Sequence, residues 1–475
     1  MKVDKNFLFI LIGRVLQAGI SILTIRIMTT VLAKDEIGSQ YLIQSIILWF
    51  SLVLINPFGM FINRHVHEWF QSNQLVSALK KMNAYFLGVG IVSIPIVYFA
   101  KEVLSIGANQ STVSVMVLVF LYIYLSTWFQ TLTSFFNLFN YQKHFVFLNI
   151  SSQALGLIFA YGLTIEFQMS AFYWMLGLLV GQFASLLMAF LFLRQNQYFN
   201  SKTQINAKLN IFTKETLHFC LPVALATVFM WFQTQGYRLI IEKSSGVELL
   251  AILGVSLGVA ASLASIVESL ATQYLYPKYY AQISNVSLDS RKQAWQLIWR
   301  AAISIYIPSA IAVMAVSSIV LKILTGPVFH MYGSFVAAGA CLELFRQLTN
   351  IVYLVSHSEK KTAGNILPYF AGSLILLLGL IYRYYFSVIS LNWIILLLIS
   401  AYFITLLLNS FVAFRLASIR FYFFQMLQIT MMCIPVLLLR PYLESISITS
   451  VVLSCLIGLY SLGVMFYFLK KIDFK

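Results

Sequence analysis

Long apolar runs separated by short polar segments make up most of the chain. A helix that crosses a membrane needs about 20 largely apolar residues. On that rule the hydrophobic pattern predicts fourteen spanning helices. Their expected bounds are 7–32, 39–62, 83–100, 112–137, 145–165, 171–193, 217–241, 247–276, 295–320, 332–356, 364–382, 391–414, 422–439 and 447–469. The sequence therefore predicts an all-α polytopic membrane protein.

Composition agrees with this class. The chain is 60% hydrophobic and only 10% charged, whereas a soluble domain carries roughly a quarter charged residues. Its net charge of +16 would suit nucleic acid. However, the basic residues lie in short loops and form no stripe interleaved with exposed aromatic residues. We therefore expect no nucleic-acid partner. The first apolar run is too long, and too poor in small-residue cleavage signals, for a removable signal peptide.

The distribution of basic residues predicts the orientation. Fourteen spans place both termini on one side of the membrane. When that side is taken as the cytoplasm, 20 Lys and Arg residues lie in cytoplasmic segments, 6 in outer segments and 5 inside spans. This bias is what the positive-inside rule requires, so both termini are expected in the cytoplasm.

A weak internal repeat predicts how the spans are grouped. Arg26 matches Arg238, and Glu36 matches Glu248, at the same offset of 212 residues. Transporters are often built from such repeats, with the cargo site between the halves. We expect two pseudo-symmetric six-helix bundles followed by two additional transmembrane helices. The expected division is 1–200, 201–415 and 416–475.

Charged residues inside the spans indicate the cargo. A charge at membrane depth usually faces a bundle interior or a wet cavity. The arginines within spans are Arg14, Arg26, Arg238, Arg300 and Arg346. Only Glu268 and Glu343 lie equally deep among the carboxylates, so the spans carry three net positive charges. Because the arginine fork binds phosphate oxygens in pairs, the excess predicts a phosphorylated cargo, with all five arginines as candidate substrate-binding residues.

Alternatives exist for several of these arginines. Arg26, Arg238 and Arg300 lie near enough to span ends to reach water along their own side chains. Arg346 lies deep, but Glu343 is three residues earlier, so a local structural pair is an alternative. Arg64 is expected at the cytoplasmic mouth, where the cargo would enter.

Polar residues at helical spacing follow two spans. Residues three or four apart share a helix face, so each stripe could line a lumen for sugars. The first comprises Thr127, Gln130, Thr131, Ser134 and Asn137, and the second comprises Ser262, Ser265, Glu268, Ser269 and Thr272. The alternative is that the hydroxyls bond the helix backbone or join helices. Gln130 and Asn137 are the candidate sugar-binding residues, because the hydrogen-bonding groups of their side-chain amides need more partners than the helix backbone can offer.

Glu268 is the candidate for ion coupling, with Glu343 as the second. No arginine lies within one turn of Glu268 on its own helix. A carboxylate in a medium of low dielectric constant takes up a proton more readily than one in water, so transport is expected to draw on an H+ or Na+ gradient, as in an antiporter. A permanently protonated glutamic acid is the alternative. We expect no other cofactor and no metal site, since neither cysteines nor histidines show ligand spacing.

Two motifs carry a resemblance to a known family. After Arg26 the chain has "L…E.G..Y", and the second span ends in a glycine followed by "NR…E". The matching residues are Leu32, Glu36, Gly38 and Tyr41, then Gly59, Asn63, Arg64 and Glu68. The chain resembles bacterial polysaccharide-export flippases of the multidrug/oligosaccharidyl-lipid/polysaccharide exporter (MOP) superfamily. One departure is that Tyr237 precedes Arg238 where the family often has aspartate.

The resemblance implies an O-antigen-type flippase in the bacterial inner membrane, without catalytic residues. Its cargo would be an undecaprenyl-pyrophosphate-linked oligosaccharide, an O-antigen or capsule repeat unit, moved to the outer leaflet by alternating access. It would work as a monomer among membrane lipids, with other glycan-assembly membrane proteins as candidate partners.

Two other classes remain as alternatives. A multidrug exporter of the same superfamily shares the layout, although the arginine excess disfavours cationic cargo. A membrane glycan polymerase or transferase would carry a large outer loop or an acidic Asp-x-Asp motif, and the chain has neither. The sequence contains no ATP-binding loop, so an ion gradient or the supply of cargo would drive transport.

Overall fold

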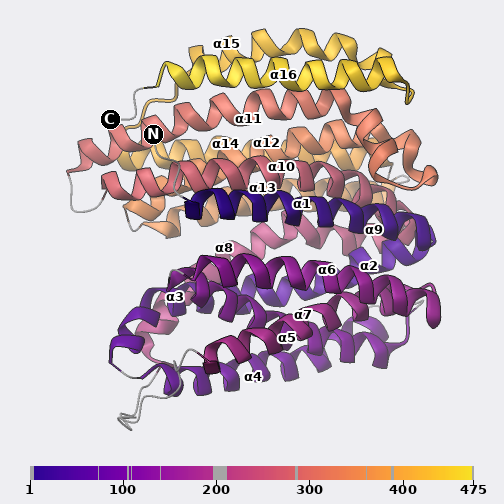
Figure 1. Ribbon diagram of the computed structural model, residues 1–475, viewed down its shortest axis with the longest axis vertical. Coiled ribbons are helices and arrows are strands. Elements are labelled where there is room, and N and C mark those ends of the chain that lie inside the picture. Colours follow the sequence, from indigo (N-terminus) through magenta and orange to yellow (C-terminus); the bar gives the residue numbers. More distant parts are fainter. Residues whose placement is uncertain are drawn as a thin grey trace. The chain divides into compact units, whose positions relative to one another are not determined.

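The computed structural model confirms the predicted fold class. It describes residues 5–72, 74–103, 106–107, 110–139, 141–195, 211–283, 287–359, 361–386 and 390–472. This described part consists of helices and their connections, and no strand occurs in it (Figure 1). Fourteen of its helical segments are long and apolar enough to cross a membrane, so the chain is a multi-pass membrane protein. Helices suit this environment because they satisfy their own backbone hydrogen bonds in hydrocarbon.

The helices follow one another with short connections. The first half contains α1 (Lys5–Val31), α2 (Lys34–Phe50), η1 (Ser51–Ile55), α3 (Asn56–Gln71), α4 (Leu75–Glu102), α5 (Thr112–Leu138), α6 (Gln142–Glu166), α7 (Ala171–Gln195), α8 (Lys214–Trp231), η2 (Phe232–Gly236) and α9 (Tyr237–Ser245). The second half contains α10 (Val247–Ile283), α11 (Leu288–Leu324), η3 (Pro327–Tyr332), α12 (Gly333–Ser358), η4 (Thr362–Asn365), α13 (Ile366–Phe386), α14 (Leu391–Ala417), α15 (Phe423–Cys433), η5 (Ile434–Leu443) and α16 (Ile448–Lys470).

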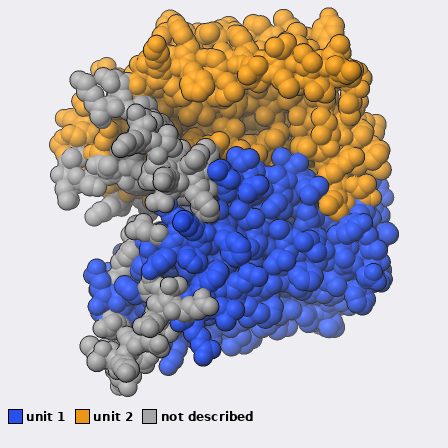
Figure 2. Space-filling model, viewed as in Figure 1, with its two compact units in different colours: residues 1–24, 31–251 blue, residues 25–30, 252–475 orange. Residues whose placement is uncertain are grey.

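The helices pack into two compact units, coloured separately in Figure 2. Unit 1 comprises residues 1–24 and 31–251, and unit 2 comprises residues 25–30 and 252–475. Helices α8 and α9 therefore pack within unit 1, although the expected division at residue 200 assigned them to the second half. Packing and internal repetition are different properties, so the two pseudo-symmetric six-helix halves stay a prediction.

Two spans of unit 1 contain a wider, π-helical turn. The second span runs through α2, η1 and α3, and the seventh runs through α8, η2 and α9. Such turns often occur at functional sites. The Trp231 indole N–H at the end of α8 donates a hydrogen bond to the Ser45 carbonyl of α2, at 2.9 Å. The two interrupted spans are thereby joined, an arrangement that the apolar pattern did not predict.

Small residues bring α6 and α7 into backbone contact. A methyl group on Gly181 would lie 2.1 Å from the backbone nitrogen of Gly156. One on Gly177 would lie 2.3 Å from the Cα of Ala160. Lipid tails are as apolar as the side chains, so no hydrophobic effect drives helices together within a membrane. Close packing at small residues joins them instead. This contact fixes the relative position of two helices whose polar side chains meet in the site described below.

Hydroxyl side chains mark several helix starts. Thr213, Ser287, Ser390 and Ser447 cap α8, α11, α14 and α16, each accepting a hydrogen bond from the backbone N–H three residues later. A cap of this kind satisfies one of the free N–H groups of a first turn. The chain thus specifies these boundaries locally.

Helices α10 and α11 are longer than their expected spans. Each has 37 residues, or roughly 55 Å at 1.5 Å per residue, against a hydrocarbon thickness of about 30 Å. Most of the connection expected at 277–294 is therefore helical. Unit 2 packs its core around α11, where the rings of Trp295 and Trp299 stack with centroids 5.5 Å apart.

Candidate functional site

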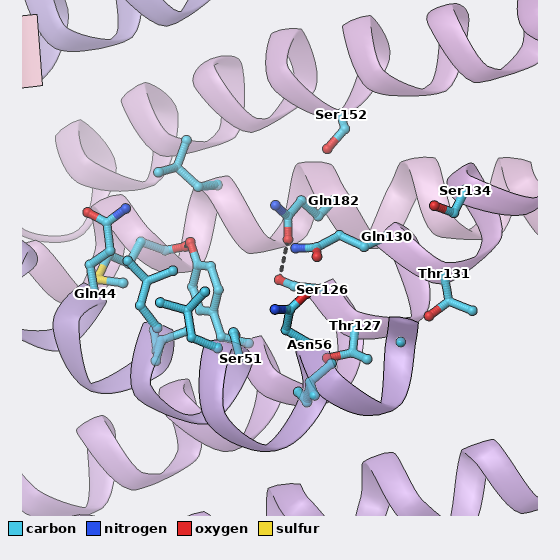
Figure 3. Close-up of a pocket in the computed structure, with 18 of the residues that line it drawn as sticks. Gln44, Ser51, Asn56, Ser126, Thr127, Gln130, Thr131, Ser134, Ser152 and Gln182 are labelled. Carbon is cyan, nitrogen blue, oxygen red and sulfur yellow. Dashed lines mark hydrogen bonds between the residues drawn. The ribbon is translucent and has the colours of Figure 1, made fainter. Parts of the chain in front are cut away.

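Unit 1 contains a polar cavity of about 560 Å³. Small-molecule sites commonly fall between about 300 and 1,000 Å³. Helices α2, α3, α5, α6 and α7, together with η1, form its walls (Figure 3). The polar lining residues are Gln40, Gln44, Ser51, Asn56, Asn63, Tyr122, Ser126, Thr127, Gln130, Thr131, Ser134, Ser152, Gln153 and Gln182.

Helix α5 contributes most of the polar stripe predicted for the fourth span. Thr127, Gln130, Thr131 and Ser134 all line the cavity, as Figure 3 shows. The fifth residue, Asn137, is exposed and is not one of the lining residues. The helical spacing was therefore sufficient to place the stripe on one face, but not to find where the cavity ends.

Helices α6 and α7 contribute further polar residues to the lining. The Ser126 hydroxyl of α5 donates a 2.5 Å hydrogen bond to the Gln182 side-chain oxygen of α7, as the dashed line in Figure 3 marks. The amide N–H groups of Gln182 are therefore available to another acceptor. Sequence reasoning missed Gln182, as well as Ser152 and Gln153 on α6. A lone glutamine within the apolar run of the sixth span was the signal that could have identified Gln182.

Two lining residues have side-chain oxygens without a hydrogen-bond partner. The Gln40 side chain is 8% exposed, and its amide donates to Gln44 at 3.3 Å, but its own oxygen accepts no bond within the described residues. The buried side-chain oxygen of Gln153 is in the same situation. Buried polar atoms almost always have a partner, whether protein or water. These two acceptors therefore indicate a place where water or a ligand donates.

The described residues of the cavity lining are all uncharged. Among the described residues, no aspartate, glutamate, lysine, arginine or histidine lines it. The side chain of Arg64, which follows the lining residue Asn63, lies outside the described part of the chain. The arginines that were predicted to bind phosphate, and whose side chains the structure describes, therefore lie outside this cavity.

A charged cluster lies in unit 2 between α10 and α12. The Arg346 guanidinium donates to Glu343 at 2.7 Å and to Glu268 at 2.5 Å. The Asn350 amide donates to the other Glu268 oxygen at 2.9 Å. Glu268 therefore has a basic partner, which sequence reasoning missed because that partner lies on another helix. With both carboxylates ionised, the cluster carries one net negative charge.

The cluster combines a pair that the residue spacing predicted with a contact that it did not. Arg346 and Glu343 form the expected local pair, and Glu268 extends it across the helix interface. The three side chains are 17–30% exposed. One bound proton on either carboxylate would make the cluster neutral. In this conformation Arg346 is therefore paired with two carboxylates and is not available to bind a phosphate.

Hydroxyl groups of the polar stripe on α10 bond their own helix backbone, which is the alternative interpretation of that stripe. The hydroxyls of Ser265 and Thr272 donate to the backbone carbonyls of Ser262 and Ser269, one turn earlier. These bonds remain within the helix. Only Glu268 reaches a neighbouring helix through a charged contact.

Arg26 contacts the end of a helix in unit 2, the unit to which residues 25–30 belong. Its guanidinium donates to the backbone carbonyls of Thr325 and, at 3.3 Å, Lys322, where α11 ends. Cations at helix C-termini bond the free carbonyls and interact favourably with the helix dipole. Thr29, one turn later, accepts a 2.9 Å bond from the Gly326 N–H. The segment around Arg26 therefore acts as a cap for α11.

Two other arginines have uncharged partners. Arg300 donates to Gln425 at 2.9 Å and lies 5.0 Å from the centre of the Tyr422 ring, so it joins α11 to α15. Arg14 donates to Gln17 at 3.1 Å. It also lies 5.6 Å from the centre of the Phe145 ring of α6.

Arg238 is the most buried of these arginines. It is 8% exposed and lies 5.2 Å from the centre of the Tyr41 ring, with the Ser45 hydroxyl at 3.5 Å. No carboxylate of the described residues pairs with it. Its position near the end of its span predicted a side chain that extends to water, but the side chain packs against α2.

Comparisons with known proteins bear on the fold. No protein family and no curated protein matches the chain. Among solved structures, lipid II flippase MurJ in an inward closed conformation is similar with a TM-score of 0.66 and 14% identity, covering 98% of this chain and 97% of that chain. A MOP superfamily transporter from Pyrococcus furiosus gives a TM-score of 0.57 and 12% identity, covering 88% and 97%. An inward-facing multidrug resistance MATE family transporter gives 0.55 and 10%, covering 88% and 96%.

At such identities the similarity shows the fold. The chain has the fold of these transporters, which MurJ matches over 98% of this chain, in agreement with the predicted fold class. The similar structures are transporters of the superfamily that the sequence motifs indicated. The O-antigen cargo remains a prediction, because fold and function are separable.

Proposed function

We propose that this protein is a flippase for a polyprenyl-pyrophosphate-linked oligosaccharide, such as an O-antigen or capsule repeat unit. It would move this cargo from the inner to the outer leaflet of the bacterial inner membrane by alternating access, with both termini in the cytoplasm. The observation that carries the proposal is the cavity inside unit 1, whose described lining residues are uncharged and mostly polar. A flippase must hold a sugar head group within the membrane, and such a head group needs hydrogen-bonding walls there.

The pyrophosphate requires cationic contacts outside that cavity. We propose Arg14 as the first of these, since its described partners are the uncharged Gln17 and Phe145. Arg64 remains the proposed entry residue. Arg346 would reach a phosphate only if its carboxylate partners were neutralised, which links cargo binding to proton uptake.

Coupling is proposed to occur at the charged cluster of unit 2. Glu268 is its best candidate, because it is held by Arg346 and Asn350 from a different helix. A proton on Glu268 would weaken the contact between α10 and α12. A carboxylate between two helices can thereby convert an ion gradient into a change of packing. Glu343 shares Arg346 and would assist, and Na+ is the other ion that this cluster could exchange.

A small-molecule exporter is the second candidate, because the same fold occurs in MATE transporters. The cavity provides no carboxylate for a cationic drug among its described lining residues, which favours the flippase. A glycan polymerase or transferase is not proposed, because the similar structures are those of transporters and not of enzymes.

The test uses purified protein in liposomes containing a fluorescent polyprenyl-pyrophosphate oligosaccharide in both leaflets. We expect the protein to expose the inner pool to a glycosidase added outside, faster than in protein-free liposomes. If no glycan lipid moves and the same liposomes accumulate a cationic dye, the exporter replaces the flippase.

A further inference from the structure

We infer that the unit 1 cavity binds uncharged sugar residues of the cargo and selects neutral glycans over acidic ones. The inference rests on the proposed function and assigns to this cavity the part of the cargo that it holds. It also separates the cargo into two regions, with sugars in the cavity and the pyrophosphate at cationic residues elsewhere.

The carboxamides of the cavity match sugar hydroxyls. Seven glutamine or asparagine side chains line it, from α2, α3, α5, α6 and α7. A carboxamide both donates and accepts hydrogen bonds, as does a hydroxyl group. Ser126 already occupies the oxygen of Gln182, so Gln182 offers its N–H groups to a sugar oxygen. The unpartnered oxygens of Gln40 and Gln153 would accept from sugar hydroxyls. The walls thus offer donors and acceptors together.

Apolar side chains complete the match. Leu48 and Leu52 lie on the same wall as the polar residues of the second span, and Met175 and Leu178 lie beside Gln182. Sugar rings have apolar C–H faces between their hydroxyls. A cavity that alternates carboxamides with aliphatic side chains can contact both kinds of surface.

The lining residues that the structure describes are all uncharged, and we expect this to provide the selectivity. A uronic acid would lose its hydration on entry and would find no cation among the described lining residues. Moving an unpaired charge from water into a protein interior is strongly unfavourable. A cationic drug would meet the same obstacle, because that part of the lining offers no carboxylate. Neutral sugars avoid this cost, since their hydroxyl groups exchange water for amides.

The test compares three polyprenyl-pyrophosphate lipids in the liposome assay. One carries a neutral oligosaccharide, one carries an oligosaccharide of the same length with uronic acids, and one carries no sugar. The variants are Gln130→Leu and Thr131→Val, which remove polar groups from the cavity. Thr133→Val is the matched control, because Thr133 lies on the same helix, is buried outside the cavity and bonds the Phe129 carbonyl.

We expect wild type to move the neutral lipid at least about tenfold faster than the acidic one. Gln130→Leu and Thr131→Val should each slow the neutral lipid by about two- to tenfold, the effect of one lost hydrogen bond. The sugar-free lipid should move at an unchanged rate in these variants, which shows that they are folded, and Thr133→Val should behave as wild type.

Two results would overturn the inference alone. The first is that wild type moves the neutral and acidic lipids at equal rates. The second is that Thr131→Val and Thr133→Val change the flipping rate of the neutral lipid equally. If wild type moves none of the three lipids, the proposed function fails and the inference falls with it.

Discussion

Arg346 joins Glu268 across the interface of α10 and α12, with 2.5 Å between the guanidinium Nη2 and the carboxylate Oε2. The same guanidinium holds Glu343 on its own helix. One cation thus keeps two carboxylates together. Removal of the arginine leaves the cluster more negative, whereas removal of a carboxylate leaves it less negative.

Arg346→Gln should destabilise the protein. It leaves Glu268 and Glu343 adjacent without a cation, and breaking a buried ion pair costs about 3–5 kcal/mol. Because these side chains are partly exposed, we expect roughly 2 kcal/mol here. Thermal unfolding in detergent measures the loss. Adding Glu268→Gln and Glu343→Gln to the same chain should restore much of it, and a triple variant as unstable as the single one would refute the charge argument.

Glu268→Gln should flatten the pH dependence of flipping. The amide carries no titratable proton, so proton uptake at position 268 could no longer change the contact between α10 and α12. Flipping rates between pH 5 and 8 in liposomes provide the measurement. Glu359→Gln is the control, because Glu359 pairs with Arg291 in the same unit but outside the cluster. A pH profile that Glu268→Gln and Glu359→Gln change equally would exclude a specific coupling role for Glu268.

Gly181→Ala should separate α6 from α7 and disturb the cavity. The added methyl group would lie 2.1 Å from the Gly156 nitrogen, a backbone atom that cannot rotate away. Overpacking of this kind typically costs about 1–3 kcal/mol. Gly162→Ala on α6 is the control, because a methyl group there meets nothing within 4 Å. The thermal midpoints of the two variants decide the matter, and equal midpoints would contradict the close contact.

Arg26→Ala separates two roles for that residue. As a cap on α11, Arg26 should contribute about 1 kcal/mol to stability, and its loss should leave the flipping rate per folded protein unchanged. A role in cargo binding, which its place in the first span also suggested, would instead reduce that rate at unchanged thermal stability. The two measurements on one preparation distinguish the roles.

The sequence predicted those features that depend on local pattern. Apolar length was enough to predict the fourteen spans, and helical spacing placed Gln130 with Thr131 and Ser134 on one face. It could not pair Glu268 with Arg346, because 78 residues separate them and only helix packing brings them together.

The same limit applies to Arg26, whose carbonyl partners are nearly 300 residues away. Distance along the chain to a span end predicted a side chain that reaches water, whereas a neighbouring helix end provided the partner. The π-helical turns in α2–α3 and α8–α9 have no periodic signature, so apolar runs that contain them resemble ordinary spans.

Entry of the cargo's sugars into the unit 1 cavity can be observed by photocrosslinking with a polyprenyl-pyrophosphate oligosaccharide that carries a diazirine on a neutral sugar. After illumination in liposomes, the labelled peptides are identified by mass spectrometry. We predict labels on α5 and α7, around Gln130 and Gln182, which excess unlabelled cargo suppresses. Labels confined to unit 2, or labels that excess cargo leaves unchanged, would show that the sugars do not bind in this cavity.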